Sequence, residues 1–575
     1  TNLAGLYRDF GQLDEAEQTL DEAYGLARAL HEKQPASVEY SALLGQIHNV
    51  RGVVYLDLAQ IDKAEKARLE TVNLWQQIYE VDDAADHHHQ LAVSHNNLAD
   101  FYRHVGASKK AAEHFEQAKG IWQQLSTDKP LVAEYAADLA LCEYSLGVMH
   151  LEAGELEKAE SQLMASEGRR RRLAQTYRQL PRYRDDLAAS LDSMGRLLHA
   201  RGAFDAAADD FRAALAIREE LRNSYPNVPK YEIAYAASQM NLGDLYKDGQ
   251  RYAEATGYFR VAADVLERVV RANPDTVAYH EHLAGAYYNL ALALSLDGDL
   301  EAAQEQVKLA AEIHHQLSDD ASPSAEQNES LAGCFDLLAL LQENLGELDE
   351  AISTYTQLIA LLRDASDSAA ATRQVVRASL QLAGLQATQG NFRAAKETIT
   401  GAIAAIDAAE SDSESAQEIK EIRHVAHAAR AKINDELGEH AAAVSDWEAA
   451  LEDDSQPMLQ LRRNNSLARS GEHKAAMANL AEAKFLDEAD ADPNLLLAAA
   501  GVVSRAVEAA EVDDALDDES RKEIVESMLS QGTEFVERSI VAGGTDFLER
   551  ARRDRDLGRL RSHSAVQKLL EEPPA

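Results

Sequence analysis

Apolar residues recur at three- and four-residue steps along most of the chain, and this spacing places them on one face of an α-helix. Two such runs follow one another between residues 231 and 275. They consist of Tyr235, Met240, Leu242, Leu245 and Tyr246, and then of Tyr252, Ala255, Phe259, Ala262, Val265 and Leu266. Gly249 lies between the runs, where a residue in the left-handed conformation can end a helix. We therefore predict two helices joined by a tight turn, each with one apolar face.

One alanine position, the marker alanine, recurs along the chain at an almost fixed interval. The first eight marker alanines are 47 or 48 residues apart: Ala16, Ala64, Ala111, Ala159, Ala207, Ala255, Ala303 and Ala351. Three further ones, at intervals of 44, 48 and 33 residues, are Ala395, Ala443 and Ala476. A period of this length indicates stacked helix pairs, each contacting only its neighbours, rather than one globular core.

The order of small and large residues between 231 and 275 resembles a known repeat. The residues in question are Leu242-Gly243, Tyr246, Ala255, Phe259, Ala262 and Pro274. They are similar to the signature of the tetratricopeptide repeat (TPR), and the resemblance extends over roughly residues 1–485. The usual TPR has about 34 residues, so the longer period implies longer helices in each pair. The resemblance implies an all-α, right-handed, TPR-like α-solenoid of about eleven helix-turn-helix repeats, mostly with a 48-residue period, and a helical C-terminal cap.

The regularity of the pattern divides the chain into three predicted parts. Residues 1–362 carry regular long repeats, residues 363–485 carry degenerate repeats, and residues 486–575 form a helical C-terminal segment. Acidic, serine-rich stretches at 318–320 and 411–415 accompany the loss of regularity. The first repeat is truncated, since residues 3–7 fall in the second half of a first helix, and we expect the sequence to be a fragment.

Charge and cysteine usage limit the classes of partner and compartment. The formal net charge of −41 disfavours binding to nucleic acid or to anionic lipid, since both depend on clustered Lys and Arg. No apolar run is long enough to span a bilayer, and no signal peptide is recognisable. Cys142 and Cys334 lie four periods apart and are expected to be buried free thiols, which suits a reducing compartment. We expect a cytoplasmic protein, and the sequence leaves its oligomeric state open.

Three short motifs resemble catalytic or ligand-binding sequences but are better explained by the repeat. Asp9-Phe10-Gly11 spells a kinase triplet, but Gly11 stands in the turn position of the repeat and no other kinase motif accompanies it. Residues 87–89 are three histidines, and consecutive side chains of a helix cannot converge on one ion. The arginine run 169–172 lies beside Glu167 and is predicted to be a solvated, acid-paired face. We therefore expect no catalytic residue, no cofactor and no metal ion.

One row of polar residues is a candidate binding site. It occupies the same position in five successive repeats, two residues before a small residue, and consists of Asn97, Ser145, Ser193, Asn241 and Asn289. This polar ladder can hydrogen-bond the backbone of an extended peptide on the concave face, or it can tie one helix to the next, as Asn commonly does in TPRs. Nearby candidates are Arg103, Arg196 and Lys247, and the neighbouring Asp100 and Asp244 make the charge mixed.

A second resemblance concerns two segments, Tyr183–Leu191 and residues 547–570. Together with the long repeats they are similar to the C-terminal TPR region of planctomycete-type bacterial serine/threonine kinases, whose kinase domain this chain lacks. The resemblance implies a non-catalytic scaffold that binds partner proteins or peptides, and that regulates or recruits substrates for a kinase. A free-standing assembly scaffold and the sensor arm of a signalling ATPase remain as alternatives.

Overall fold

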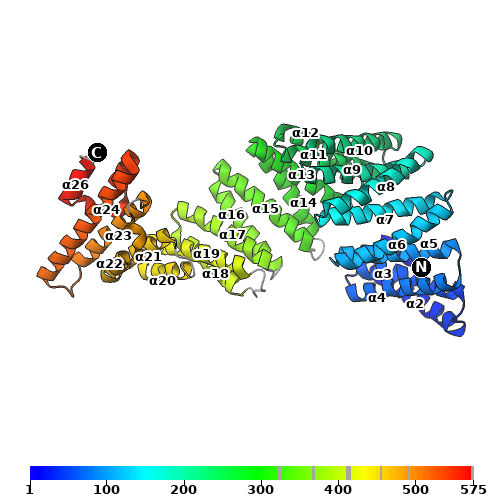
Figure 1. The fold of residues 1–575 in the computed structure, drawn as a ribbon, viewed down its shortest axis with the longest axis horizontal. Helices are drawn as coiled ribbons and strands as arrows, with labels where there is room; N and C mark the ends of the chain where they lie inside the picture. The colour runs from blue at the N-terminus through cyan, green and yellow to red at the C-terminus, as the bar shows by residue number, and fades with distance from the viewer. Residues whose placement is uncertain (320–324, 366–368, 409–415, 453–455, 489–490, 572–575) are drawn as a thin grey trace. The chain divides into compact units, whose positions relative to one another are not determined.

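The computed structural model describes residues 1–319, 325–365, 369–408, 416–452, 456–488 and 491–571 (Figure 1). These residues form 26 α-helices and two short 3-10 helices, with no β-strand among them. The predicted all-α class and the succession of helix pairs are confirmed. The acidic stretch 411–415 and Asp320 lie outside the described residues.

The chain divides into two compact units, Thr1–Asp297 and Gly298–Ala575. The helices of unit 1 are α1 (Asn2–Asp9), α2 (Leu13–Lys33), α3 (Val38–Asp57), α4 (Ile61–Val81), α5 (Ala85–His104), α6 (Ser108–Asp128), α7 (Ala133–Glu152), α8 (Leu156–Thr176), α9 (Pro181–Ala200), α10 (Phe204–Ser224), α11 (Pro229–Asp248), α12 (Tyr252–Ala272) and α13 (Val277–Asp297). Odd-numbered helices are the first helices of the repeats and even-numbered helices are the second. The predicted boundaries near 362 and 485 describe regularity rather than compactness, and they stay predictions.

Unit 2 begins with repeats and ends with the C-terminal segment. Its elements are α14 (Leu300–Asp319), α15 (Ala325–Leu345), α16 (Leu348–Ala365), α17 (Ala369–Thr388), α18 (Phe392–Ala408), α19 (Ala416–Glu436), α20 (His440–Ala450), α21 (Pro457–Arg469), α22 (His473–Ala481), η1 (Lys484–Leu486), α23 (Pro493–Glu511), α24 (Asp518–Arg553), η2 (Arg555–Leu557), α25 (Gly558–Arg561) and α26 (Ser564–Glu571).

Helix length follows the period of the sequence. Helices α2 to α13 have 20 or 21 residues each, which confirms the long arms expected from the 48-residue repeat. Helices α20, α21 and α22 have only 11, 13 and 9 residues. The shortening coincides with the shorter final interval between the marker alanines.

Close contact between the two helices of a pair explains the marker alanines and the small residues opposite them. All eleven marker alanines, one in each even-numbered helix from α2 to α22, are 0 % exposed. A Cβ atom on Gly195 would lie 2.7 Å from the Phe211 ring, and one on Gly243 would lie 2.6 Å from the Phe259 ring. In these two pairs a glycine in the first helix therefore leaves room for the aromatic ring of the second helix.

The turn inside each pair requires a left-handed residue five positions before the marker alanine. Gly106 and Gly202 hold this position, with φ of 76° and 74°. In the pair α11–α12 the prediction for Gly249 is wrong, because Gly249 has a φ of −76° and the next residue, Gln250, has a φ of 58°. The left-handed residue of the turn always lies five positions before the marker alanine. Gly249 lies one position too early and therefore does not adopt this conformation.

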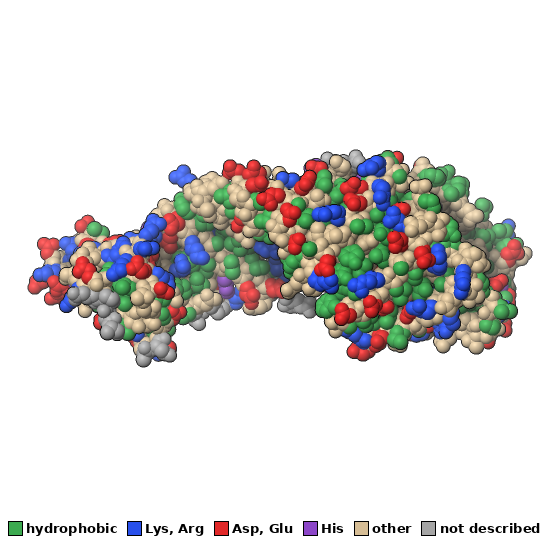
Figure 2. All heavy atoms as spheres, turned by 90° about the horizontal axis from the view of Figure 1, so that it is seen from above, with side chains coloured by type: hydrophobic (Ala, Val, Ile, Leu, Met, Phe, Trp, Pro, Cys, Tyr) green, Lys and Arg blue, Asp and Glu red, His purple; other side chains and the backbone are tan. Residues whose placement is uncertain are grey.

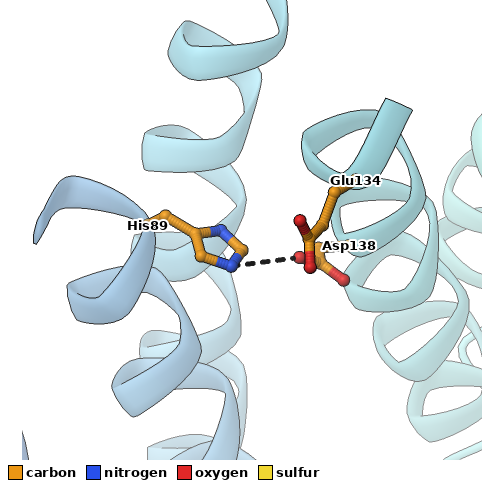
Figure 3. A group of neighbouring side chains, drawn as sticks. All are labelled: His89, Glu134 and Asp138. Atoms are coloured by element: carbon orange, nitrogen blue, oxygen red, sulfur yellow. Dashed lines mark ion pairs between the residues drawn. The ribbon is translucent and has the colours of Figure 1, made fainter. Parts of the chain in front are cut away.

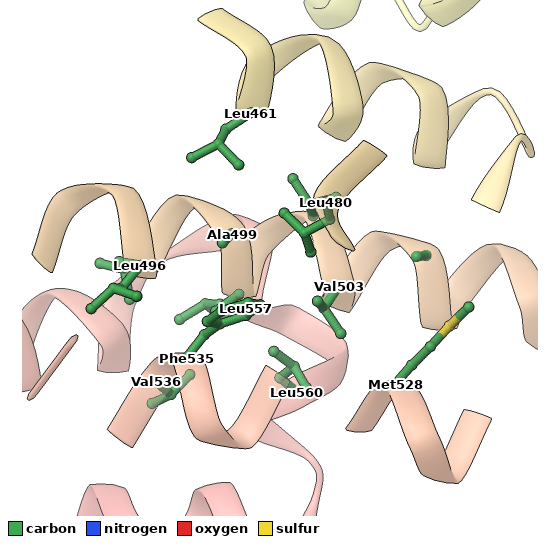
Figure 4. Close-up of a cluster of buried hydrophobic side chains, with 14 of the residues drawn as sticks. Leu461, Leu480, Leu496, Ala499, Val503, Met528, Phe535, Val536, Leu557 and Leu560 are labelled. Carbon is green, nitrogen blue, oxygen red and sulfur yellow. The ribbon is translucent and has the colours of Figure 1, made fainter. Parts of the chain in front are cut away.

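The C-terminal segment has a core of its own between α21 and the end of the chain (Figure 4). Leu496 and Val503 of α23 pack there with Phe535 of α24 and Leu560 of α25. Helix α24 is interrupted at Gly544, whose φ is 68°. The last helices thus fold back on α23 and cover the end of the repeats of unit 2.

Two sequence expectations concern burial and membranes. Both cysteines are free and buried, as expected, and burial raises the pKa of both thiols. The Cys142 thiol donates to the backbone carbonyl oxygen of Phe115 at 3.2 Å. Among the helices that the structure describes, none combines the length and apolarity that a membrane span requires.

Candidate peptide-binding face and its buried support

The polar ladder lies on five first helices of unit 1: α5, α7, α9, α11 and α13. Ser193 is buried, and the other four side chains, Asn97, Ser145, Asn241 and Asn289, are half-buried. The structure therefore places the ladder at equivalent positions of successive helices, partly accessible and partly packed. Whether a peptide binds there stays a prediction.

Three ladder residues bond to the first helix of the preceding repeat. Asn97 Nδ2 donates to Asn49 Oδ1 at 3.0 Å, and Ser193 Oγ donates to Tyr144 Oη at 3.3 Å. Asn241 hydrogen-bonds the Asp192 carboxylate. The partners lie 48 or 49 residues earlier in the chain and differ in kind. These three side chains tie adjacent repeats together, as the second interpretation of the ladder predicted.

The remaining two ladder residues, Ser145 and Asn289, lack this tie. Met240, whose thioether is only a weak acceptor, stands 49 residues before Asn289, and Asn241, 48 residues before it, already bonds to Asp192. Asn96, 49 residues before Ser145, has a buried Oδ1 without a hydrogen-bond partner among the described residues, and Asn97, 48 residues before it, donates to Asn49. The polar groups of Ser145 and Asn289 are therefore the ones that a ligand can use without breaking a contact between repeats.

Two of the three charged candidates have an acidic neighbour on the same helix. Arg103 Nε lies 3.8 Å from Asp100 Oδ1, and Lys247 Nζ lies 2.7 Å from Asp244 Oδ1. Burial raises the pKa of Asp100. Arg196 is exposed and makes no ion pair with any described residue. Positive charge that is not already neutralised is thus confined to Arg196 among these three.

A buried ionic network contacts the ladder through Asp192. Its existence was not predicted from the sequence. Arg218 Nη1 lies 2.6 Å from Asp192 Oδ2, and both side chains are 9 % exposed. The same nitrogen donates to the backbone carbonyl of Ala234 at 2.9 Å and to Ser238 Oγ at 2.8 Å. Burial raises the pKa of Asp192. Because Asp192 also accepts a hydrogen bond from Asn241, the network connects the packing of α10 with a half-buried residue of the ladder.

Arg170 makes the same bonds one repeat earlier. Its Nη1 donates to the backbone carbonyl of Asp186 at 2.8 Å and to Ser190 Oγ at 3.1 Å. The expectation of a solvated arginine face is wrong for Arg170, which is 4 % exposed, because its position in the repeat points into the core. The acid pairing holds for Arg171 with Glu167 and for Arg169 with Glu143. The signal that could have revealed the network is that Arg170 and Arg218 occupy the position held by Trp75 and Trp122 in earlier repeats.

The three consecutive histidines do not converge, as predicted, but one of them meets acids of the next repeat (Figure 3). His87 and His88 lie against Asp82 and Asp83. His89 of α5 points toward Glu134 and Asp138 of α7, and its Nε2 lies 3.6 Å from Asp138 Oδ2. Ligand atoms of His89, Glu134 and Asp138 all lie within 4.8 Å of one another, a spacing that could hold a metal ion. Burial raises the pKa of Asp138.

The hydrogen bonding of His89 does not fit a resident metal. Trp122 Nε1 donates to His89 Nδ1 at 3.1 Å, and an indole nitrogen can only donate. Nδ1 is therefore unprotonated and the proton sits on Nε2, the atom that faces the carboxylates. A histidine that ligates through one ring nitrogen normally carries its proton on the other nitrogen. Metal binding would thus break the bond to an indole that is 2 % exposed, at a cost of about 1–3 kcal/mol.

We expect Trp122→Phe to create a zinc site that the wild-type chain lacks. Without the indole donor, Nδ1 can take up the proton and Nε2 can ligate together with Glu134 and Asp138. Isothermal titration with Zn²⁺ near neutral pH should show one more bound ion for Trp122→Phe than for the wild type. The extra ion should disappear in Trp122→Phe/His89→Ala. A wild-type chain that binds one ion more than His89→Ala would contradict this reasoning.

Comparison with known proteins gives the type of repeat. One family model described as tetratricopeptide repeat matches residues 187–224 and 236–275, and a second model with the same description matches residues 334–369. TPRs are thus detected in both units. The matched stretch of unit 1 includes Ser193 and Asn241 of the ladder. TPRs are generally non-catalytic and generally mediate protein–protein interactions.

Solved structures of several proteins resemble parts of the chain. BtubC (BKLC) from P. vanneervenii is 21% identical with a TM-score of 0.34, over 43% of this chain and 87% of that one. Aspartyl phosphate phosphatase F from Bacillus subtilis is 14% identical with a TM-score of 0.36, over 72% and 94%. A putative kinesin light chain with TPR-like repeats from Podospora anserina is 19% identical with a TM-score of 0.27, over 37% and 92%. Curated protein sequences gave no match.

Proposed function

We propose that the chain is a non-catalytic scaffold that binds partner proteins or peptides along the first helices of unit 1. The observation that carries the proposal is the polar ladder, which presents one polar side chain per repeat at equivalent positions of α5 to α13. An extended peptide has backbone donors and acceptors along its whole length, and a row of amides and hydroxyls can satisfy them. The TPRs detected at residues 187–275 support this type of partner.

The charge distribution supports proteins rather than nucleic acids as partners. The net charge is −41, and on the face shown in Figure 2 acidic and basic side chains are interspersed. Nucleic-acid binding depends on Lys and Arg clustered along one surface. Protein recognition tolerates mixed charge and uses it for specificity. A cytoplasmic location is part of the proposal, supported by the two buried free thiols.

The test compares two pairs of ladder residues, using a peptide selected from a random phage-displayed library against the whole chain. Ser145→Ala/Asn289→Ala should weaken that peptide by about tenfold, because each hydrogen bond to the ligand contributes about 0.5–1.5 kcal/mol. The thermal midpoint of the Ser145→Ala/Asn289→Ala chain should stay unchanged, since neither side chain ties repeats together.

The matched control is Asn97→Ala/Asn241→Ala, which removes ties between repeats and should lower the thermal midpoint. Peptide affinity measured by fluorescence anisotropy separates the two roles. Normal binding by the Ser145→Ala/Asn289→Ala chain would place recognition elsewhere on the molecule.

A finer proposal is that the scaffold regulates, or recruits substrates for, a bacterial serine/threonine kinase. It is supported only by the resemblance of Tyr183–Leu191 and of residues 547–570. In the structure both segments have packing roles: Ser190 accepts from Arg170, and Leu557 and Leu560 are buried in the C-terminal core. A free-standing assembly scaffold and the sensor arm of a signalling ATPase are the alternatives. Reading the gene upstream of Thr1 distinguishes the three, because a kinase or an ATPase domain would be encoded there.

A further inference from the structure

Two histidines meet between the helices of one pair in unit 1. His95 lies on α5 and His114 on α6, and their Nδ1 atoms are 3.0 Å apart. The ring centres are 5.2 Å apart, and the ring planes are inclined to one another by 29°. Both side chains are half-buried, so the pair is not sealed from solvent. Because 19 residues separate the two histidines in the chain, no short sequence motif reveals the pair.

The repeat itself brings these two positions together. The first stands 16 residues before a marker alanine and the second three residues after it. In the pair α19–α20 the same positions hold His427 and Asp446, whose Nδ1 and Oδ1 atoms are 2.9 Å apart. That carboxylate also accepts hydrogen bonds from Arg430 and Asn434. Among the repeats of this sequence, only α5–α6 carries a histidine at both positions.

Neither ring of the pair is positively charged near neutral pH. Burial, together with the neighbouring His114, lowers the pKa of His95 to about 4. Burial also lowers the pKa of His114, with a smaller contribution from Lys110 and an opposing one from the Glu113 carboxylate. Both imidazoles are therefore neutral, which is the state in which a ring nitrogen can ligate a metal ion.

The surroundings of the pair hold the His114 ring and engage the nearest cation. The Tyr102 ring lies almost parallel to the His114 ring, with 5.7 Å between the ring centres. Tyr102 Oη donates to Glu65 Oε1 at 2.8 Å, and Lys110 Nζ donates to the same oxygen at 3.2 Å. The Glu65 carboxylate thus offsets the positive charge of Lys110, which would otherwise repel a metal ion at the histidines.

We propose that His95 and His114 together bind one Cu²⁺ ion through their Nδ1 atoms, with water completing a square-planar coordination. Two nitrogen ligands at right angles, each about 2.0–2.1 Å from an ion, lie about 2.9 Å apart, close to the observed 3.0 Å. Of the divalent first-row ions, Cu²⁺ binds nitrogen ligands most tightly. The site replaces the expectation of no metal ion, and it is independent of the ladder and of the proposed scaffold function.

Binding requires a small rearrangement of the two rings. In the hydrogen bond between them one Nδ1 carries a proton and the other accepts it. That proton moves to Nε2 of the same ring, so both ligands stay neutral, and a rotation of the rings turns the two lone pairs from one another toward the ion.

The test titrates the whole chain with Cu²⁺ at about pH 5.5, where exposed histidines, with a pKa of about 6.5, are mostly protonated and bind little metal. His95→Phe and His114→Tyr should each weaken the tightest bound ion by more than tenfold, measured by calorimetry. Both substitutions suit the fold, because Phe335 and Tyr258 hold the corresponding positions in other repeats. The matched control is His104→Phe, which removes an exposed histidine of the same α5 and should leave the affinity unchanged.

Pulsed electron paramagnetic resonance identifies the ligands directly. With less than one equivalent of Cu²⁺, the wild-type chain should show the remote nitrogens of two imidazoles on one ion, and each histidine variant should lose this signal. Equal affinity of the wild type and both variants, or a first ion with fewer than two imidazole ligands, would overturn the proposal. The wild-type spectrum decides alone should circular dichroism show that a variant does not fold.

Discussion

Replacing Asp192 by alanine is expected to lower the free energy of unfolding by about 3–5 kcal/mol. The change leaves the Arg218 guanidinium buried without its carboxylate and removes the acceptor of Asn241 at the same time. Arg218 keeps only the Ala234 carbonyl and Ser238 as partners. Urea denaturation of the whole chain, followed by circular dichroism, measures the loss, and hydrogen exchange should place it in α9 to α12.

The control for this prediction removes both charges together. A buried ion pair replaced by apolar residues of similar size is often nearly neutral in stability. Asp192→Leu/Arg218→Met should therefore be more stable than Asp192→Ala, although it carries more substitutions. If the double variant is instead the least stable, the pair contributes net stability and the penalty for an unpaired charge is not the dominant effect.

Replacing the marker alanine Ala207 by arginine is expected to destabilise its repeat by about 3 kcal/mol or more. Ala207 is 0 % exposed, so the longer side chain must displace packed neighbours and buries a charge without a partner. Because each repeat contacts only its neighbours, hydrogen exchange should accelerate mainly between residues 160 and 255.

The matched control is Ala213→Arg on the same helix, at an exposed position. It introduces the same side chain and charge and should change the free energy of unfolding by less than about 0.5 kcal/mol. Uniform loss of protection through both units in the Ala207→Arg chain would contradict the nearest-neighbour description.

The sequence predicts the repeat well because one simple steric rule recurs. A small residue must stand wherever two helices touch, so the marker alanines and glycines such as Gly243 reveal each pair and its period. The turn residue is less predictable, since the position rather than the glycine is repeated. Gln250 adopts the left-handed conformation although Gly249 stands beside it.

The ties of the ladder are harder to predict because they depend on pairs of residues far apart in the chain. A ladder residue is tied to the preceding repeat only when a side chain 48 or 49 residues earlier can hydrogen-bond to it. The side chains that do so differ in kind: they are Asn49, Tyr144 and Asp192.

The identical bonds of Arg170 and Arg218 have a consequence for how the array can grow. Arg218 meets Ser238 as Arg170 meets Ser190, one 48-residue period apart. Had a duplication inserted a second copy of residues 181–228, the Arg218 of the first copy would find Ser190 of the second in the place of Ser238. Asp192 of the first copy would likewise face a hydroxyl, that of Ser193, which can donate to it. Gene duplication in this part of the chain can therefore add whole repeats with their interfaces already matched, so that the number of repeats changes while the joints between them remain the same.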